Sequence, residues 1–281
     1  MASQIQIQIQ IQDYVLKNSE SGFETACVCI DLSAAFDTIS HQVLLKKLKM
    51  YKVSNQVIQW FISYLSQWGQ YTQIGISRSE IRPIKTGIFQ GSLGGPILFI
   101  IFINDIQSLA NNLFCFYTYA DDTCILQKLS NSKLINQAIL KDKLTEVKLY
   151  MHSNCLKLNM DKTEFMVLHP CLSVRKTKHH DMVAHFDQDR IEQQPKARLL
   201  GCQINPKFNQ TEYINSVCEF LTKCICVMRM LSGRLSVTQR NMLAQGLVIS
   251  KISFCLCYWA TTSEKNLDRL QQTDRQSGRS L

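Results

Sequence analysis

Two adjacent acids, Asp121 and Asp122, lie between two apolar stretches of the chain, residues 114–117 and 124–126. Each stretch has the composition of a buried β-strand, so the acids are expected at a tight turn between two strands. Another acid, Asp31, ends a further apolar stretch. Carboxylates in an apolar interior are costly unless they are neutralised or meet a counter-ion. The pattern therefore predicts buried strands that carry three carboxylates.

Three carboxylates presented in this way suit a divalent cation. Hard oxygen ligands favour Mg²⁺ or Mn²⁺, and a pair of such ions is widely used for phosphoryl transfer. Two acids in a turn are by themselves more often a solvated turn. The apolar flanks and the matching stretch before Asp31 favour the metal site instead.

Composition allows a large core and points to an acidic partner. The chain has 281 residues, 46% of them hydrophobic and 19% charged, with a formal net charge of +9. From residue 196 to the end there are 12 Lys or Arg and 5 Asp or Glu. Beside a metal-carboxylate site, a basic segment of this kind favours nucleic acid.

The cysteine pattern and the length of the apolar runs argue against a secreted, disulfide-bonded protein and against a membrane protein. The 12 cysteines include three C-x-C pairs but no C-x-x-C, and no secretory signal precedes them, so reduced thiols in the core are expected. The longest apolar run, Pro96–Ile103, is too short for a bilayer, which needs about 20 residues. A nuclear or cytoplasmic protein is expected, not a secreted or membrane one.

Periodicity predicts an α+β chain. Residues 4–12 alternate Gln and Ile, which predicts a disordered leader or an edge strand. The other expected elements are strands at 26–31, 114–120, 123–127, 164–168, 182–186 and 198–204, a hairpin from 71–76 and 81–86, helices at 42–50, 54–65, 93–109 and 131–155, and helices from 211 onwards.

Five segments in order resemble the motifs of reverse transcriptases, most closely those of non-LTR (LINE-type) retrotransposons. They are Asp31–Asp37, Gln90–Ser92 with Pro96–Phe99, Tyr119–Asp122, Leu158–Thr163 and Leu199–Gly201. Each motif alone is a weak signal, whereas five in the right order and spacing are a strong one. The resemblance implies a nucleotidyltransferase, an RNA-directed DNA polymerase that transfers nucleotides by a two-metal reaction onto a primer 3′-hydroxyl.

The resemblance also assigns roles to individual residues. It implies that Asp31, Asp121 and Asp122 bind two Mg²⁺ or Mn²⁺ ions, and that Lys162 acts as a general acid or phosphate contact. The implied nucleotide-binding residues are Phe36, Gln90 and Gly91, and Leu200 and Gly201 are the implied primer grip. Read without the resemblance, Phe36 is a core residue and Lys162 an exposed surface lysine.

The implied architecture is the palm and thumb of a right-hand polymerase. Residues 1–25 form the low-complexity leader, 26–205 the palm with an antiparallel sheet and packed helices, and 206–281 a basic helical thumb that includes Arg229, Arg234, Arg240 and Lys251. Lys17 is the sole basic residue before Asp31. Fingers are therefore expected to be largely missing, as in a copy truncated before the palm.

The implied partners are an RNA template with a DNA primer and deoxynucleoside triphosphates, with no membrane; the sequence identifies no protein partner. Three alternatives remain open at this point. The chain is a working polymerase domain, a catalytically inactive retroelement remnant that only binds nucleic acid, or a poorly folded pseudogene product.

Overall fold

A four-stranded antiparallel sheet in the order β6-β7-β1-β8 organises the chain. The computed structural model describes residues 4–66, 68–89, 91–92, 94–170, 178–208, 211–231, 233–254 and 268. The sheet strands are β1 (Thr25–Ile30), β6 (Phe114–Tyr119), β7 (Asp122–Lys128) and β8 (Glu164–Leu168). All four were expected from the sequence. The two middle strands are apolar on both faces, because helices and strands cover each side.

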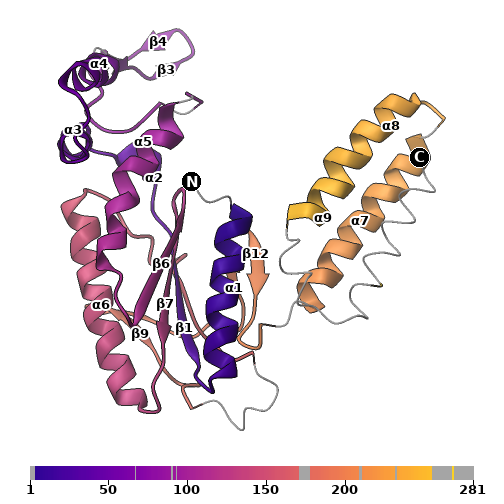
Figure 1. The fold of residues 1–281 in the computed structure, drawn as a ribbon. Helices are drawn as coiled ribbons and strands as arrows, with labels where there is room; N and C mark the ends of the chain where they lie inside the picture. Colours follow the sequence, from indigo (N-terminus) through magenta and orange to yellow (C-terminus); the bar gives the residue numbers. More distant parts are fainter. Residues whose placement is uncertain are drawn as a thin grey trace.

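Long helices cover one face of the sheet (Figure 1). They are α5 (Gly94–Ile103), its 3₁₀ continuation η1 (Asn104–Leu109) and α6 (Lys133–Ser153). Ala26, Val28 and Ile30 of β1 point into the apolar cluster on this side, together with Phe99 of α5 and Leu144 of α6. The mixed helix-and-sheet fold expected from the sequence is confirmed.

The opposite face of the sheet is covered by α1 (Gln4–Glu20), whose place beside the sheet is clear in Figure 1. Ile7, Ile11 and Val15 of this helix are buried in a second apolar cluster with Cys27 of β1 and Leu126 of β7. The hairpin β11 (Ala197–Leu199) and β12 (Cys202–Ile204) and the helix α7 (Thr211–Leu231) complete this cluster.

The expectation of a strand or a disordered leader over residues 4–12 is wrong, because these residues begin α1. A strict two-residue repeat also places identical residues four positions apart, which is the spacing of one helix face. Ile7 and Ile11 therefore face the sheet, whereas Ile5 and Ile9 are exposed. Burial of one half of the repeat against the sheet favours the helix over the strand.

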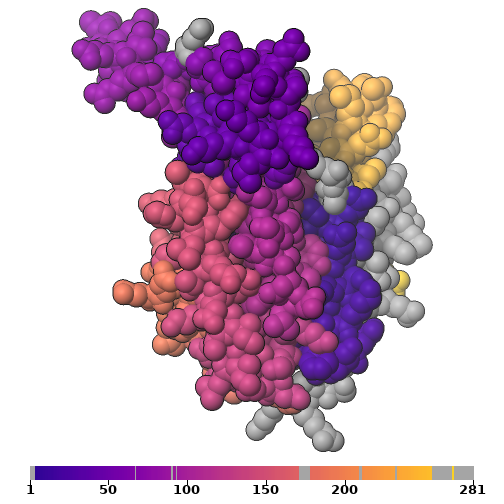
Figure 2. Space-filling model, turned by 60° about the vertical axis from the view of Figure 1, so that its left-hand side comes forward, coloured from indigo at the N-terminus to yellow at the C-terminus, as the bar shows by residue number. Residues whose placement is uncertain are grey.

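Residues 35–66 and 68–89 form a lobe at one end of the molecule (Figure 2). It contains α2 (Ala35–Thr38), α3 (His41–Met50) and α4 (Asn55–Leu65). The Ser40 side chain caps α3 by accepting a hydrogen bond from the Val43 backbone N–H. Instead of one hairpin, two short pairs follow: β2 (Gly69–Gln70) with β5 (Arg82–Pro83), and β3 (Gln73–Ile74) with β4 (Ser77–Arg78).

The last described elements are helical, as expected. After α7 come α8 (Val237–Leu243), the π-helical segment η2 (Ala244–Ile249) and α9 (Ser250–Phe254). None of the described helices has both the length and the apolar character needed to span a membrane.

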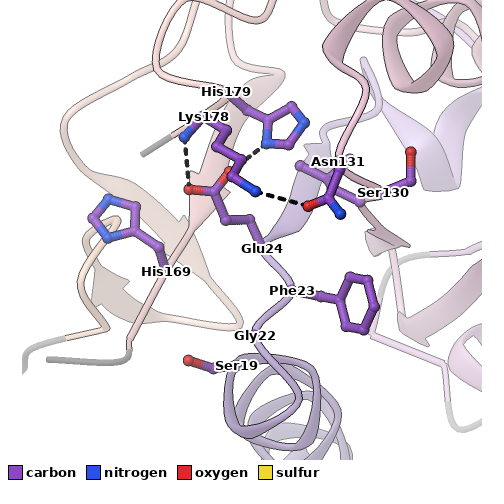
Figure 3. Close-up of a pocket in the computed structure, with 10 residues that line it drawn as sticks. Ser19, Gly22, Phe23, Glu24, Ser130, Asn131, His169, Lys178 and His179 are labelled. Carbon is purple, nitrogen blue, oxygen red and sulfur yellow. Dashed lines mark hydrogen bonds and ion pairs between the residues drawn. The ribbon is translucent and has the colours of Figure 1, made fainter. Parts of the chain in front are cut away.

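A buried polar contact fastens the segment after residue 177 to the end of the sheet (Figure 3). His179 Nδ1 donates to the carboxylate of Glu24, and its Nε2 accepts from Asn136 Nδ2 of α6 at 2.9 Å. The strands β9 (Ala184–Phe186) and β10 (Asp189–Ile191) follow. The first of these was expected, whereas β10 was not. The small cavity beside this contact, about 50 Å³, shares no lining residue with the acidic cavity described below.

The expectation of reduced thiols holds for the eight described cysteines that are free, among them buried Cys27 and Cys124. Cys202 departs from it, because this residue is disulfide-bonded.

Candidate active site

The three acids predicted to act together lie at one end of the sheet. Tyr119 and Asp122 are register partners at the end of the β6–β7 hairpin, and Ala120 in its turn has a left-handed backbone with φ of 50°. Asp31 follows β1, whose last residue, Ile30, pairs with Thr123 of β7. Adjacent antiparallel strands therefore bring Asp31 next to the hairpin.

All three acids line a single cavity of about 690 Å³. The same cavity is lined by two further acids and one arginine that the sequence did not single out, namely Asp161, Glu164 and Arg198. Asp161 lies inside the fourth motif, Leu158–Thr163, and Glu164 directly follows it. This position could have identified both acids. Arg198 directly precedes the Leu199–Gly201 motif in sequence.

The environment of Asp122 disfavours its charged form. Partial burial raises the pKa of the Asp122 carboxyl, and the negative charges of Asp121 and Asp31 raise it further. The positive charge of Arg198 acts in the opposite direction. Asp122 is open to the cavity, yet the surrounding protein removes enough water to disfavour its charged form. A cation in the cavity would relieve this repulsion.

The carboxylates are spaced more openly than a closed single-ion site. We considered groups of at least three Cys, His, Asp or Glu side chains whose ligand atoms all lie within 4.8 Å of one another. Among the residues that the structure describes, one such group exists, and it consists of thiols rather than carboxylates.

The backbone of Asp31 is fixed by the segment that holds Lys162. The Asn159 N–H donates to the Asp31 carbonyl oxygen at 2.9 Å, and the Asp31 N–H donates to Thr163 Oγ1 at 3.4 Å. Thr163 Oγ1 in turn donates to the Asn159 carbonyl oxygen at 2.7 Å. This compact turn positions the exposed Lys162 at the cavity that contains the acids.

Leu200 and Gly201 form the turn between β11 and β12 and also line the acidic cavity. Both have left-handed backbones, with φ of 47° and 77°. The Leu200 carbonyl oxygen accepts hydrogen bonds from Gln4 Nε2 at 2.7 Å and from Gln8 Nε2 at 3.0 Å. The Gln-Ile repeat therefore supports this turn, a role that the sequence did not indicate.

Phe36, one of the residues expected to bind nucleotide, lies on α2 in the lobe and contacts α5. The Phe36 ring stacks on Phe99, with centroids 4.8 Å apart, and the Ile88 N–H donates to the Phe36 carbonyl oxygen at 2.8 Å. Phe36 is half-buried and is not among the residues that line the acidic cavity. Gly91 has a left-handed φ of 82° with open space around it, and Gln90 lies outside the described residues.

A basic recess of about 370 Å³ adjoins the acidic cavity and shares Glu164, Arg198 and Gly201 with it. Lys196 of the loop before β11 and Lys251 of α9 also line this recess. Positive side chains from the sheet side and from the C-terminal helices therefore meet beside the acids.

Comparison with known proteins agrees with this arrangement. Residues 3–204 match the family model described as reverse transcriptase (RNA-dependent DNA polymerase). The chain is 26% identical over 159 residues to an RNA-directed DNA polymerase from the mobile element jockey of Drosophila melanogaster, covering 54% of this chain and 17% of that protein. It is 22% identical over 273 residues to a probable RNA-directed DNA polymerase from transposon BS of the same species, covering 90% and 28%.

Solved structures share the fold at low sequence identity. A telomerase from Candida albicans, in complex with the TWJ fragment of telomeric RNA, has a TM-score of 0.52 at 13% identity, covering 97% of this chain and 51% of that one. The corresponding Candida tropicalis complex has a TM-score of 0.50 at 12% identity, covering 90% and 42%. The chain spans less than a third of the two Drosophila proteins it matches. The family model matches residues 3–204, from α1 to β12, and the relatives come from mobile elements. This chain therefore belongs to the reverse transcriptase family.

Proposed function

We propose that this chain acts as an RNA-directed DNA polymerase domain that adds deoxynucleotides to a primer 3′-hydroxyl. The observation that carries the proposal is the shared cavity of Asp31, Asp121 and Asp122, beside a basic recess. Reverse transcriptases generally use divalent metal ions. The alternative is a catalytically inactive remnant that only binds nucleic acid through the basic recess.

The carboxylate set fits two Mg²⁺ or Mn²⁺ ions, since its ligands are hard oxygens, and since burial, together with the negative charges of the other two acids, raises the pKa of Asp122. In the proposed site Asp31 and Asp121 hold the ions and Asp122 assists. When bound, such ions activate the attacking hydroxyl and stabilise the leaving pyrophosphate. The protein contributes the carboxylates: the β6–β7 hairpin positions Asp121 and Asp122, and the end of β1 positions Asp31.

Other residues, inside the cavity and outside it, have proposed supporting roles. Lys162 is exposed at the cavity wall and would donate a proton or hold a phosphate. Leu200 and Gly201 would contact the primer, since their turn is fixed against α1 at the same cavity. Gly91 and Gln90 would approach the incoming nucleotide, and Phe36 would exclude a ribose 2′-hydroxyl.

The proposed division is a palm over residues 26–205 and a thumb over 206–281. The packing of α7 against β11 and β12 supports a thumb that closes on a duplex beside the acids. Lys196, Arg198 and Lys251 would neutralise phosphates of an RNA template and DNA primer held in the basic recess.

Primer extension tests the proposal. Full-length protein is incubated with poly(rA)/oligo(dT), deoxythymidine triphosphate and Mg²⁺, then with Mn²⁺ in its place. We expect metal-dependent product from the wild type and a fall to background in Asp121→Asn. Asp142→Asn, which removes the same charge from an exposed position on α6, should retain wild-type activity.

The same preparations distinguish the alternative. Binding of labelled poly(rA)/oligo(dT) without any product, from a wild-type protein that unfolds cooperatively, would contradict the polymerase and support the remnant. Equal product from the wild type and Asp121→Asn would show that these carboxylates do not catalyse the reaction.

A further inference from the structure

Three thiols meet on the face of the sheet that α1 covers, near the strand ends that carry the acids. Cys27 and Cys29 lie two residues apart on β1 and therefore point to the same side. Cys124 of β7 is the register partner of Cys29. The Cys27 Sγ lies 3.8 Å from the Cys29 Sγ and 3.6 Å from the Cys124 Sγ. All three sulfurs lie within 4.8 Å of one another.

We propose that Cys27, Cys29 and Cys124 form a site for a thiophilic divalent ion of the zinc class. Zinc binds thiolate at about 2.3 Å in tetrahedral geometry, which separates two ligating sulfurs by about 3.8 Å. The observed sulfur separations of 3.8 and 3.6 Å match this value without rearrangement of either strand.

The fourth coordination position faces the acidic cavity. Cys29 and Cys124 both line that cavity, whereas Cys27 is fully buried. The other register partner of Cys29 is Glu164 of β8, which lines the same cavity. A water molecule or the Glu164 carboxylate is therefore available to complete a tetrahedral site. Solvent reaches the site through the cavity, so an ion can enter without unfolding of the core.

The donor set separates this site from the proposed magnesium site. Thiolates select zinc-class ions, whereas the carboxylates of Asp31 and Asp121 select magnesium or manganese. The sequence did not indicate the thiol site, because its ligands come from two strands and Cys27 and Cys124 are 97 residues apart in the chain. On coordination each thiol proton passes to solvent, so ion uptake releases up to three protons.

Cobalt substitution tests the site, using full-length reduced protein and no nucleic acid. We expect one equivalent of Co²⁺ to produce a thiolate-to-metal charge-transfer band that Zn²⁺ abolishes and excess Mg²⁺ does not. The variant Cys27→Ala/Cys29→Ala/Cys124→Ala should lose the band. Cys218→Ser, which removes a half-buried thiol from α7, should keep it.

A second variant and readout guard against misfolding of the triple variant. Cys29→Ser alters one ligand at the cavity wall and should weaken both the band and the Zn²⁺-induced rise in Tm. No band in the wild type, or a band that survives the triple variant, would overturn the proposal. Since the readout requires no polymerisation, its outcome is independent of whether the chain is an active polymerase.

Discussion

Gly201 illustrates how a single residue shapes the acidic cavity. Its φ of 77° disfavours side chains, and a Cβ there would lie 3.0 Å from the Cζ atom of Phe254. Gly75 in the β3–β4 turn has a similar φ of 60° but open space around it. Comparison of the two glycines separates backbone strain from side-chain crowding at the cavity.

We expect Gly75→Ala to lower the free energy of unfolding by about 1 kcal/mol, the usual cost of a left-handed backbone at an L-residue. Gly201→Ala should lower it by about 2–3 kcal/mol, because the new methyl group also displaces the Phe254 ring. Urea denaturation of the two full-length variants measures both values. Equal losses would mean that Phe254 moves aside freely.

At the scale of elements, the burial of alternate isoleucines in the Gln-Ile repeat distinguishes a helix from a strand. In α1, Ile11 is 0% exposed and Ile9 is 49% exposed, whereas in a strand both side chains would share one face. We expect Ile11→Ala to lower the free energy of unfolding by about 2–4 kcal/mol through an unfilled cavity. Ile9→Ala should change it by less than about 1 kcal/mol. Similar losses in the two variants would contradict the helix.

The strands and helices that carry the acids could be predicted because their local patterns agree with their tertiary environment. Asp121 and Asp122 were expected at a strand turn, and β8 was expected with the bounds that it has. The repeat in α1 could not be resolved from its pattern, because a two-residue period satisfies both a strand and a helix face. Only burial of Ile7 and Ile11 against the sheet decides between them.

The site was predictable where its residues lie within motifs and unpredictable where they meet through tertiary packing. Asp31 and Asp121 were identifiable from apolar flanks, and the structure brings them to one cavity. The hydrogen bonds from Gln4 and Gln8 to Leu200 join residues almost 200 positions apart, so no local pattern could reveal them.

At the scale of the whole molecule, positive charge is concentrated beside the acids by the return of the C-terminal helices. Lys251 of α9 lines the same recess as Arg198 of β11, although the sequence places them in separate segments. A phosphate backbone that enters the recess would release counter-ions from each basic residue that it contacts. Salt dependence of binding therefore reports whether the recess is the nucleic-acid surface.

We expect the plot of log affinity against log salt concentration, for poly(rA)/oligo(dT), to lose about one unit of slope in Lys251→Ala. Lys141→Ala removes the same charge from an exposed position on α6, the helix on the other side of the sheet, and should leave the slope unchanged. Fluorescence anisotropy over a range of salt concentrations measures both. Equal slopes for the two variants would locate the duplex elsewhere on the protein. A slope lost in Lys251→Ala, with catalysis absent in the wild type, would instead describe a remnant that keeps its nucleic-acid surface after losing polymerisation.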